Sequence, residues 1–175
     1  MHEALELLQT VGDSLEDGLY AVDTEGTLCY MNRAAETALG LTLADHRGRL
    51  AHDVFHHHSA DGQPLAIDDC DLAEVLSWGY PYVGDQTLVT GSGTYLAVIC
   101  SSTAIRRGDQ QVGAVVAFRP RAGGAARVSP AAAAVLGFLA DASYDATITV
   151  DDKGIIRHWT SSAMVLFGFT REEVV

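Results

Sequence analysis

The sequence predicts an α+β fold, in which a five-stranded antiparallel sheet has short helices on one face and an amphipathic helix at the N-terminus. The order of the expected elements is a helix, two strands, several short helices and three strands, and tight turns join neighbouring strands. The composition is that of a globular chain, because 48% of the 175 residues are hydrophobic and 19% are charged.

The first expected element is a helix over residues 3–14. Its apolar residues are spaced by four, three and four positions, which is typical of helices that pair with one another. These residues are Ala4, Leu8, Val11 and Leu15.

A hairpin is expected next. Apolar residues predict strands over 18–22 and 27–31. The turn between them begins at Asp23 and ends at Gly26, residue types that favour a hairpin.

Capping residues predict two helices. Asparagine and aspartate accept hydrogen bonds from the free N–H groups at a helix start, and glycine ends a helix in a left-handed conformation. The first expected helix is Arg33–Leu39, which Asn32 caps and Gly40 ends. Asp71 is expected to cap the second helix, which runs through about Trp78 and ends at Gly79. The cluster of Asp68, Asp69 and Asp71 is explained by the preference of a helix N-terminus for negative charge.

The remaining chain of the first unit divides into an irregular part and three strands. Residues 41–70 are expected to be irregular, with helical turns near 43–46 and 49–54. The strands are expected at about 82–90, 94–105 and 112–119, with turns at Gly91-Ser-Gly93 and Arg107-Gly-Asp109.

The chain repeats itself at a constant offset of 128 positions (151 minus 23), without a gap. Asp23 and Gly26 correspond to Asp151 and Gly154. Further matched pairs are Ala4 and Ala132, Leu8 and Leu136, Val22 and Val150, Ala35 and Ala163, and Gly40 and Gly168. The repeat predicts a first domain at 1–120, a linker at 121–130, and at 131–175 the truncated start of a second domain, as in a chain cut from a longer one.

The repeated segments resemble a PAS (Per-ARNT-Sim) sensor domain. The resemblance rests on EDGLYAVDTEGTLCYMNRAAETALG at 16–40 and GDQQVGAVVAFRP at 108–120, and it resumes in SYDATITVDDKGIIRHWTSSAMVLFGFTREEV at 143–174. The second copy has Thr160 where the first has Asn32. The resemblance implies signal input without catalysis, and an apolar pocket that family members use for haem, flavins or small metabolites, or leave empty.

The resemblance also implies which residues line this pocket. Strand alternation places Tyr20, Val22, Leu28 and Tyr30 on one face of the first hairpin. The usual register of the family adds Val98, Cys100, Ser102, Val116 and Phe118, and Trp78 is a possible neighbour of a flavin ring. The alternative is that all of these residues pack as ordinary core, with Trp78 at a helix end.

A histidine-rich stretch offers possible metal or haem ligands, because imidazole and thiolate bind zinc and iron. The weak candidates are His56, His57, His58 and Cys70. Adjacent histidines cannot all face one ion from a regular element, and the helix DLAEVLSW lacks the histidine that haem-binding members supply. GRLAHDVFHHH lacks the cysteine of covalent flavin photochemistry, so a non-covalent flavin, haem, a small metabolite or no cofactor remain open. Partly buried histidines, or pH sensing, are the alternatives to a metal site.

Charge and composition limit the partners. With 11 Lys plus Arg against 23 Asp plus Glu, the net charge is −12, which disfavours nucleic acid and anionic membranes. Three cysteines are an odd number without a repeating spacing, which argues against a disulfide framework and favours a reducing cytoplasm. A homodimer is expected through the apolar positions of the two repeated helices, Ala4, Leu8, Val11, Leu15, Leu136 and Leu139.

These observations predict a cytoplasmic sensory module that regulates an output domain, such as a kinase, cyclase or phosphatase, beyond residue 175. The module itself is not expected to be an enzyme. Two other readings stay open: a dimerisation scaffold without a ligand, and a metal-dependent enzyme built on the histidine-rich stretch.

Overall fold

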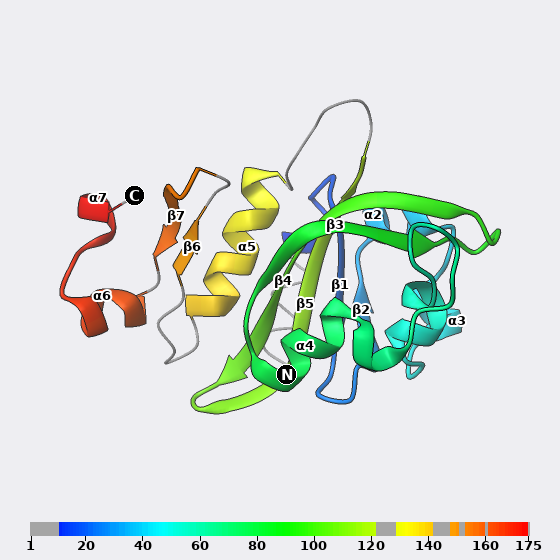
Figure 1. Ribbon diagram of the computed structural model, residues 1–175, viewed down its shortest axis with the longest axis horizontal. Helices are drawn as coiled ribbons and strands as arrows, with labels where there is room; N and C mark the ends of the chain where they lie inside the picture. The colour runs from blue at the N-terminus through cyan, green and yellow to red at the C-terminus, as the bar shows by residue number, and fades with distance from the viewer. Residues whose placement is uncertain (1–10, 122–128, 142–147, 151–152, 160, 175) are drawn as a thin grey trace.

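The computed structural model describes residues 11–121, 129–141, 148–150, 153–159 and 161–174 (Figure 1). One antiparallel sheet has the strand order β2-β1-β5-β4-β3, so the first and last strands of the unit pair at its centre. The strands are β1 (Gly18–Val22), β2 (Leu28–Met31), β3 (Tyr82–Val89), β4 (Tyr95–Arg107) and β5 (Gln110–Pro120). The predicted α+β fold with a five-stranded antiparallel sheet is confirmed.

Short helices lie between β2 and β3. They are α2 (Arg33–Leu39), α3 (Leu43–His46), the π-helix η1 (His52–His56), the 3-10 helix η2 (Ile67–Asp69) and α4 (Asp71–Trp78). Their apolar side chains, including Leu39, Phe55 and Val75, form one core with the inner face of the sheet.

A longer helix, α5 (Pro130–Asp141), covers the opposite face of the sheet. In Figure 1 it lies beside β4 and β5, away from α4. Ala132 and Leu136 are buried there among Leu19, Val115 and Ala117. The central strands are therefore buried on both faces, which explains why β1 is an unbroken run of buried residues.

The hairpin of β1 and β2 contains a bulge. Val22 pairs with Leu28 but Ala21 pairs with Tyr30, which leaves Cys29 as an extra residue on β2. An extra residue reverses the alternation of side chains along a strand. Tyr30 therefore packs on the outer face, and the prediction that it shares a face with Tyr20 is wrong.

Asn32 fixes the connection from this hairpin to α2. Its side-chain oxygen accepts hydrogen bonds from Leu19 N at 2.8 Å and from Ala35 N at 2.9 Å. Asn32 therefore caps α2 and ties the start of this helix to β1. Gly40 then ends α2 with φ 63°, a left-handed conformation that costs glycine little. The predicted start and end of this helix are confirmed.

Two local predictions between α2 and β3 are wrong. The helical turn expected near 49–54 is a π-helix shifted to His52–His56, and its wider turn places both Phe55 and His56 in the core. Asp71 does not cap α4, because Cys70 holds the cap position and has no side-chain hydrogen bond to the helix. Residues 52–65 are called the histidine segment below.

The described part of the second copy repeats the hairpin of the first in its register. It comprises β6 (Ile148–Val150), β7 (Ile156–Trp159), α6 (Ser161–Phe167) and α7 (Arg171–Val174). Ile148 pairs with Trp159, and Val150 pairs with Ile156. The equivalent pairs in the first hairpin are Tyr20 with Met31 and Val22 with Leu28, and both hairpins have a bulge at the same place.

Most of the helix expected over residues 3–14 lies outside the described residues, which begin at residue 11. No helix among the described residues is long and apolar enough to span a membrane.

Candidate functional site

Most of the residues predicted to line an apolar pocket pack together as core. Seven of them are at most 2% exposed and pack against one another and against the helices: Tyr20, Val22, Leu28, Val98, Cys100, Val116 and Phe118. Ser102, on the same face, pairs with Val116 and is 3% exposed. The alternative reading, that these side chains are ordinary core, describes their packing better.

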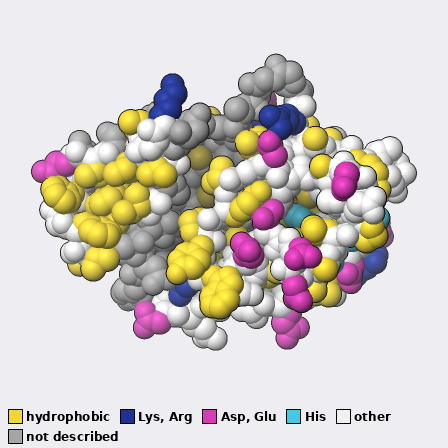
Figure 2. Space-filling view, viewed as in Figure 1, with side chains coloured by type: hydrophobic (Ala, Val, Ile, Leu, Met, Phe, Trp, Pro, Cys, Tyr) yellow, Lys and Arg dark blue, Asp and Glu magenta, His cyan; other side chains and the backbone are white. Residues whose placement is uncertain are grey.

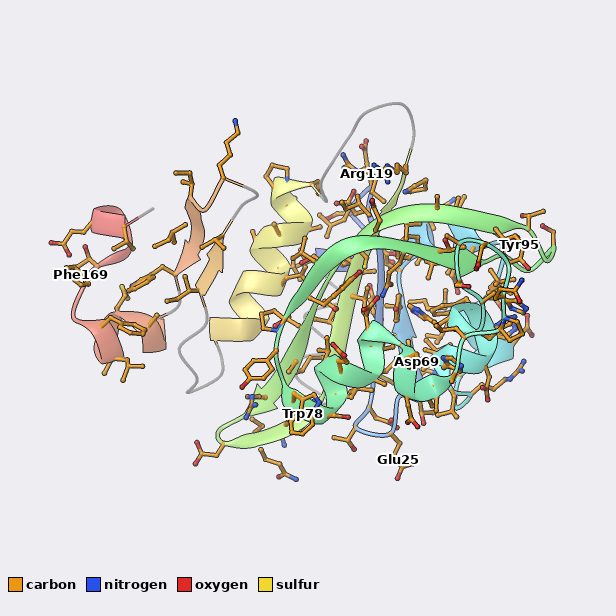
Figure 3. All side chains as sticks on the ribbon, in the orientation of Figure 1. Glu25, Asp69, Trp78, Tyr95, Arg119 and Phe169 are labelled. Atoms are coloured by element: carbon orange, nitrogen blue, oxygen red, sulfur yellow. The ribbon has the colours of Figure 1, made fainter. Side chains whose placement is uncertain are left out.

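Trp78 lies apart from this core. It is 71% exposed at the C-terminal end of α4, and Figure 3 shows it at the edge of the molecule. Packing at a helix end, the alternative considered for Trp78, is therefore wrong, whereas its role as a neighbour of a flavin ring stays a prediction. No sequence signal distinguishes an exposed tryptophan at a helix end from a buried one.

A cavity of about 310 Å³ lies beside this core, between the histidine segment, the start of α4 and strand β3. Val98 is the one predicted pocket residue that lines it, together with His56, His58 and Cys70, which the sequence suggested as weak metal candidates. Polar lining comes from Asp69, Asp71, Asp85, Gln86, Thr87 and Arg121. The cavity is thus apolar at one wall and acidic at its rim.

His56 forms the buried base of this cavity. Its Nε2 lies 2.5 Å from the hydroxyl of Tyr20, and both side chains are at most 3% exposed. Phe55 packs edge-on against Tyr20, with ring centroids 4.9 Å apart. Burial lowers the pKa of His56 to about 3 and raises the pKa of Tyr20, so the pair is neutral.

The neutral pair fixes the histidine tautomer. Among the described residues the buried Tyr20 hydroxyl has no other hydrogen-bond acceptor, so it donates its proton to Nε2 of His56. The ring proton of His56 is then on Nδ1, which has no hydrogen-bond partner among the described residues. Because His56 lines the cavity, Nδ1–H is a donor available to a bound molecule.

The other histidines do not assemble a metal site. Nδ1 of His52, His57 and His58 is buried without a partner, and the rings of His57 and His58 lie edge to face, with centroids 4.7 Å apart. In the described part of the chain, no three His, Cys, Asp or Glu side chains are arranged to hold an ion. Burial raises the pKa of the Cys70 thiol, which disfavours the thiolate that a metal needs.

The acidic rim is only partly neutralised. Arg121 Nη1 lies 2.5 Å from Asp85 Oδ2, which pairs that carboxylate. Asp71 accepts a hydrogen bond from the neutral amide of Gln86 at 2.8 Å. Within the described residues neither Asp69 nor Asp71 is in an ion pair. Figure 2 shows acidic side chains on the face that α4 and β3 present, with a histidine visible beside them.

A second, smaller cavity of about 210 Å³ lies between the β1–β2 turn and α4. It is lined by Gly26, Leu50, Leu76 and Asp68, among others, and it shares Cys70 with the larger cavity. Asp68 does not line the larger cavity, although Asp69 does.

A buried carboxylate connects the sheet to α5. Asp17 is fully buried just before β1, and its Oδ1 is 2.7 Å from Arg119 Nε and 2.6 Å from Nη2, near the end of β5. The other oxygen accepts a hydrogen bond from Ser129 N, and the Ser129 hydroxyl in turn accepts from Ala132 N in the first turn of α5. The start of β1, the end of β5 and the start of α5 therefore share one side chain, which the sequence analysis did not identify.

The helix positions predicted for a dimer lie differently. Leu136 packs on the outer face of the chain's own sheet, and Leu15 packs against the same cluster, so neither is free for a partner helix. That part of the prediction is wrong, because the sheet needs its second face covered. Val11 is partly buried, whereas Ala4, Leu8 and the side chain of Leu139 lie outside the description.

The comparisons with known proteins agree with this architecture. A family model described as PAS fold matches residues 13–120. None of the curated proteins matches the chain significantly.

Solved PAS domains have the same fold. One from Colwellia psychrerythraea is similar with TM-score 0.54 and 17% identity, over 67% of this chain and 96% of that one. The PAS domain of nitrogen regulation protein NR(II) from Vibrio parahaemolyticus gives TM-score 0.51 and 19% identity, over 66% and 98%. A PAS domain from a two-component sensor histidine kinase gives TM-score 0.51 and 13% identity, over 69% and 98%. The family model covers more than half of the chain, and we conclude that the chain belongs to the PAS-fold family.

Proposed function

We propose that this chain is a cytoplasmic sensory module that binds a small ligand in the cavity beside β3 and passes its occupancy to an output domain through α5. Similar PAS domains belong to a sensor histidine kinase and to a nitrogen regulation protein, both signalling proteins by name. The observation that carries the proposal is the buried His56, which offers an unpartnered ring nitrogen to a cavity of about 310 Å³. The module is not itself catalytic.

The large cofactors considered from the sequence do not fit this arrangement. Ligand sites span about 300–1,000 Å³, and this cavity lies at the lower end of that range. The inner face of the sheet, where a flavin or haem would need a flat space, is filled by close-packed side chains such as Tyr20 and Phe118. A small metabolite is therefore the ligand class that we propose.

The route from the cavity to α5 runs along β1. A ligand that bonds to His56 changes the environment of Tyr20, which is on β1 three positions after Asp17. Asp17 holds Arg119 and the start of α5. We propose that a shift of β1 is transmitted to α5 through this carboxylate. While Asp17 is bonded to Arg119 and Ser129, β1, the end of β5 and the start of α5 cannot move independently.

A second proposal concerns residues 131–175. The register and bulge shared by the β6–β7 and β1–β2 hairpins support a second, tandem unit of the same fold that begins with α5. Several apolar side chains at positions equivalent to buried ones are exposed here: Val150 is 60% exposed and Phe167 is 51% exposed, against 0% for Val22 and Leu39. A unit of this fold would bury them against its remaining strands.

A scaffold that dimerises without a ligand is the alternative function, and the closed core favours it. The homodimer itself remains a proposal for the N-terminal helix, with Ala4, Leu8 and Val11 as its contact positions. Leu8→Glu would place a charge in that contact and lower the dimer fraction in sedimentation at tens of micromolar. A wild-type monomer at that concentration would remove the dimer from the proposal.

The ligand-binding function is tested by blocking the cavity. Ala97 lines the cavity and is exposed, so Ala97→Trp fills the mouth without disturbing the core. Thr37→Trp, on the exposed face of α2, is the matched control. In a thermal-shift screen of small metabolites, we expect hits with the wild type and with Thr37→Trp, and none with Ala97→Trp. Hits that survive in Ala97→Trp, or a complete lack of hits with a stable dimer, would favour the scaffold.

A further inference from the structure

The cavity has a rim that is electrically unbalanced. Asp69, Asp71 and Asp85 line it, and Arg121 is the cation among its lining residues. Arg121 is already paired with Asp85, and the partner of Asp71 is the uncharged amide of Gln86. Asp69 and Asp71 therefore face a partly enclosed space, and no cation among the described residues pairs with either of them. Such carboxylates attract positive charge, because Coulomb attraction is stronger in a partly enclosed space than in bulk water.

The base of the cavity offers a hydrogen-bond donor, in contrast to the carboxylate acceptors of the rim. His56 is 3% exposed, lines the cavity, and has its Nε2 occupied by the Tyr20 hydroxyl. The proton on Nδ1 is a donor without an acceptor among the described residues. Because His56 lines the cavity, this donor can bond to a ligand that brings an acceptor.

We propose that the ligand is a small organic cation, an ammonium or amidinium compound that also carries a neutral acceptor such as a carbonyl or hydroxyl oxygen. Its charged end lies between Asp69 and Asp71, and its acceptor receives the Nδ1 proton of His56. Val98 and Leu65 contact the carbon skeleton between these two ends. This inference rests on the proposed function and specifies the ligand class of that same cavity.

The same charges select against anions. A carboxylate or phosphate placed in the cavity would lie near Asp69 and Asp71, and the guanidinium that could offset this repulsion is bonded to Asp85. Neutral amides would satisfy His56 but leave the two carboxylates without a cation. Discrimination by charge is therefore the property to measure.

The experiment uses compounds that share a side chain and differ in charge. Matched triplets are built on glycine, valine and leucine: the amino-acid amide is a cation, the N-acetyl amino acid an anion, and the N-acetyl amide neutral. Each is titrated into the ¹⁵N-labelled 175-residue chain, and binding is followed by NMR at the amides of Thr87, Ala97 and His56. We expect the cationic amino-acid amides to bind at least about tenfold more tightly than the anions, and their binding to weaken as the salt concentration is raised.

Two variants test the origin of this preference. Asp69→Asn with Asp71→Asn removes both charges while keeping the side-chain shapes, and should weaken binding of the cations about tenfold or more. Asp68→Asn is the control, because Asp68 is adjacent in sequence but does not line this cavity. The ¹⁵N shift of His56 Nδ1 should move on binding in the wild type, which reports the acceptor independently of the variants.

Three outcomes would overturn the proposed ligand class: anions bind as tightly as cations, the double variant binds cations as well as the wild type, or no cation moves the cavity resonances at about 10 mM. An anion that binds in this cavity and is blocked by Ala97→Trp would overturn the ligand class but leave the sensory function standing. Loss of binding for every class of ligand would remove the sensory function as well.

Discussion

Asp17 and Arg119 form an ion pair that links the beginning of β1 to the end of β5, across 102 positions of sequence. The carboxylate is fully buried, whereas the guanidinium is 32% exposed and keeps contact with water. Its second oxygen holds the backbone of Ser129 at the start of α5. The pair is thus both a stabilising contact of the sheet and the attachment of the helix that leaves it.

Asp17→Asn should destabilise the fold and loosen α5. The amide keeps one acceptor but loses the charge that Arg119 and Ser129 N share, and we expect a loss of about 1–3 kcal/mol of unfolding free energy in urea. Asp85→Asn is the control, because its pair with Arg121 is more than half exposed and should cost less than about 0.5 kcal/mol. Equal effects of the two substitutions would contradict the role assigned to Asp17.

The Tyr20–His56 pair predicts a pH dependence of stability. The folded pKa of His56 is about 3, whereas an unfolded histidine titrates near 6.5, so only the unfolded state takes up this proton as pH falls below about 6.5. Stability is therefore fully present above the unfolded pKa and is lost toward pH 3. Between pH 7.5 and 5.0 the wild type should lose about 2 kcal/mol more than Tyr20→Phe with His56→Phe, as measured by urea unfolding at each pH. Parallel pH profiles would mean that the pKa of His56 is not lowered in the folded chain.

Local patterns predicted the parts of the fold that depend on neighbours in sequence. Asn32 and Gly40 mark the ends of α2 because capping depends on the adjacent backbone. The same reasoning failed at Asp71, where the chain enters the helix one residue earlier, at Cys70. Which of two adjacent residues takes the cap position depends on the path of the preceding loop.

The site could not be predicted because its geometry depends on contacts that are distant in sequence. A single bulge residue, Cys29, moves Tyr30 to the outer face, and strand alternation has no signal for it. The alternation of side chains correctly predicts that Val98 lies on the inner face of the sheet. It does not predict whether the neighbouring elements leave a cavity beside this residue. That space exists because η1, a π-helix, brings His56 beneath β3, and π-helices have no reliable sequence signature.

Asn32→Ala tests the link between the first hairpin and α2. The side chain accepts from Leu19 N and Ala35 N and donates to Gly12 O and Asp17 O, all in the buried interior. Removing it leaves these groups unpaired, so we expect a loss of about 2–4 kcal/mol in chemical denaturation. Thr42→Ala removes an exposed cap of α3 and should cost about 1 kcal/mol or less. A similar cost for both would show that water reaches the position of Asn32.

Hydrogen exchange should separate the two copies of the hairpin. Strands β4 and β5 lie within a five-stranded sheet, whereas β6 and β7 pair only with each other among the described strands. A two-stranded hairpin is marginally stable in water, so its amides should exchange orders of magnitude faster than those of β4 and β5. The measurement is exchange followed by mass spectrometry on the 175-residue chain as a monomer. Equal protection would show that another part of the chain covers the second hairpin.

Leu136→Glu distinguishes packing on the sheet from packing on a partner helix. Leu136 is 5% exposed and contacts the outer face of the chain's own sheet, so a buried carboxylate there should release α5 and cost several kcal/mol if α5 cannot shift. Ala133→Glu lies on the exposed side of the same helix and should have little effect. We expect Leu136→Glu to lower the melting temperature and to speed exchange in α5, while any dimer seen by sedimentation persists. If the substitution instead dissociates a dimer without changing the stability of the monomer, the helix packs between two chains and not on its own sheet.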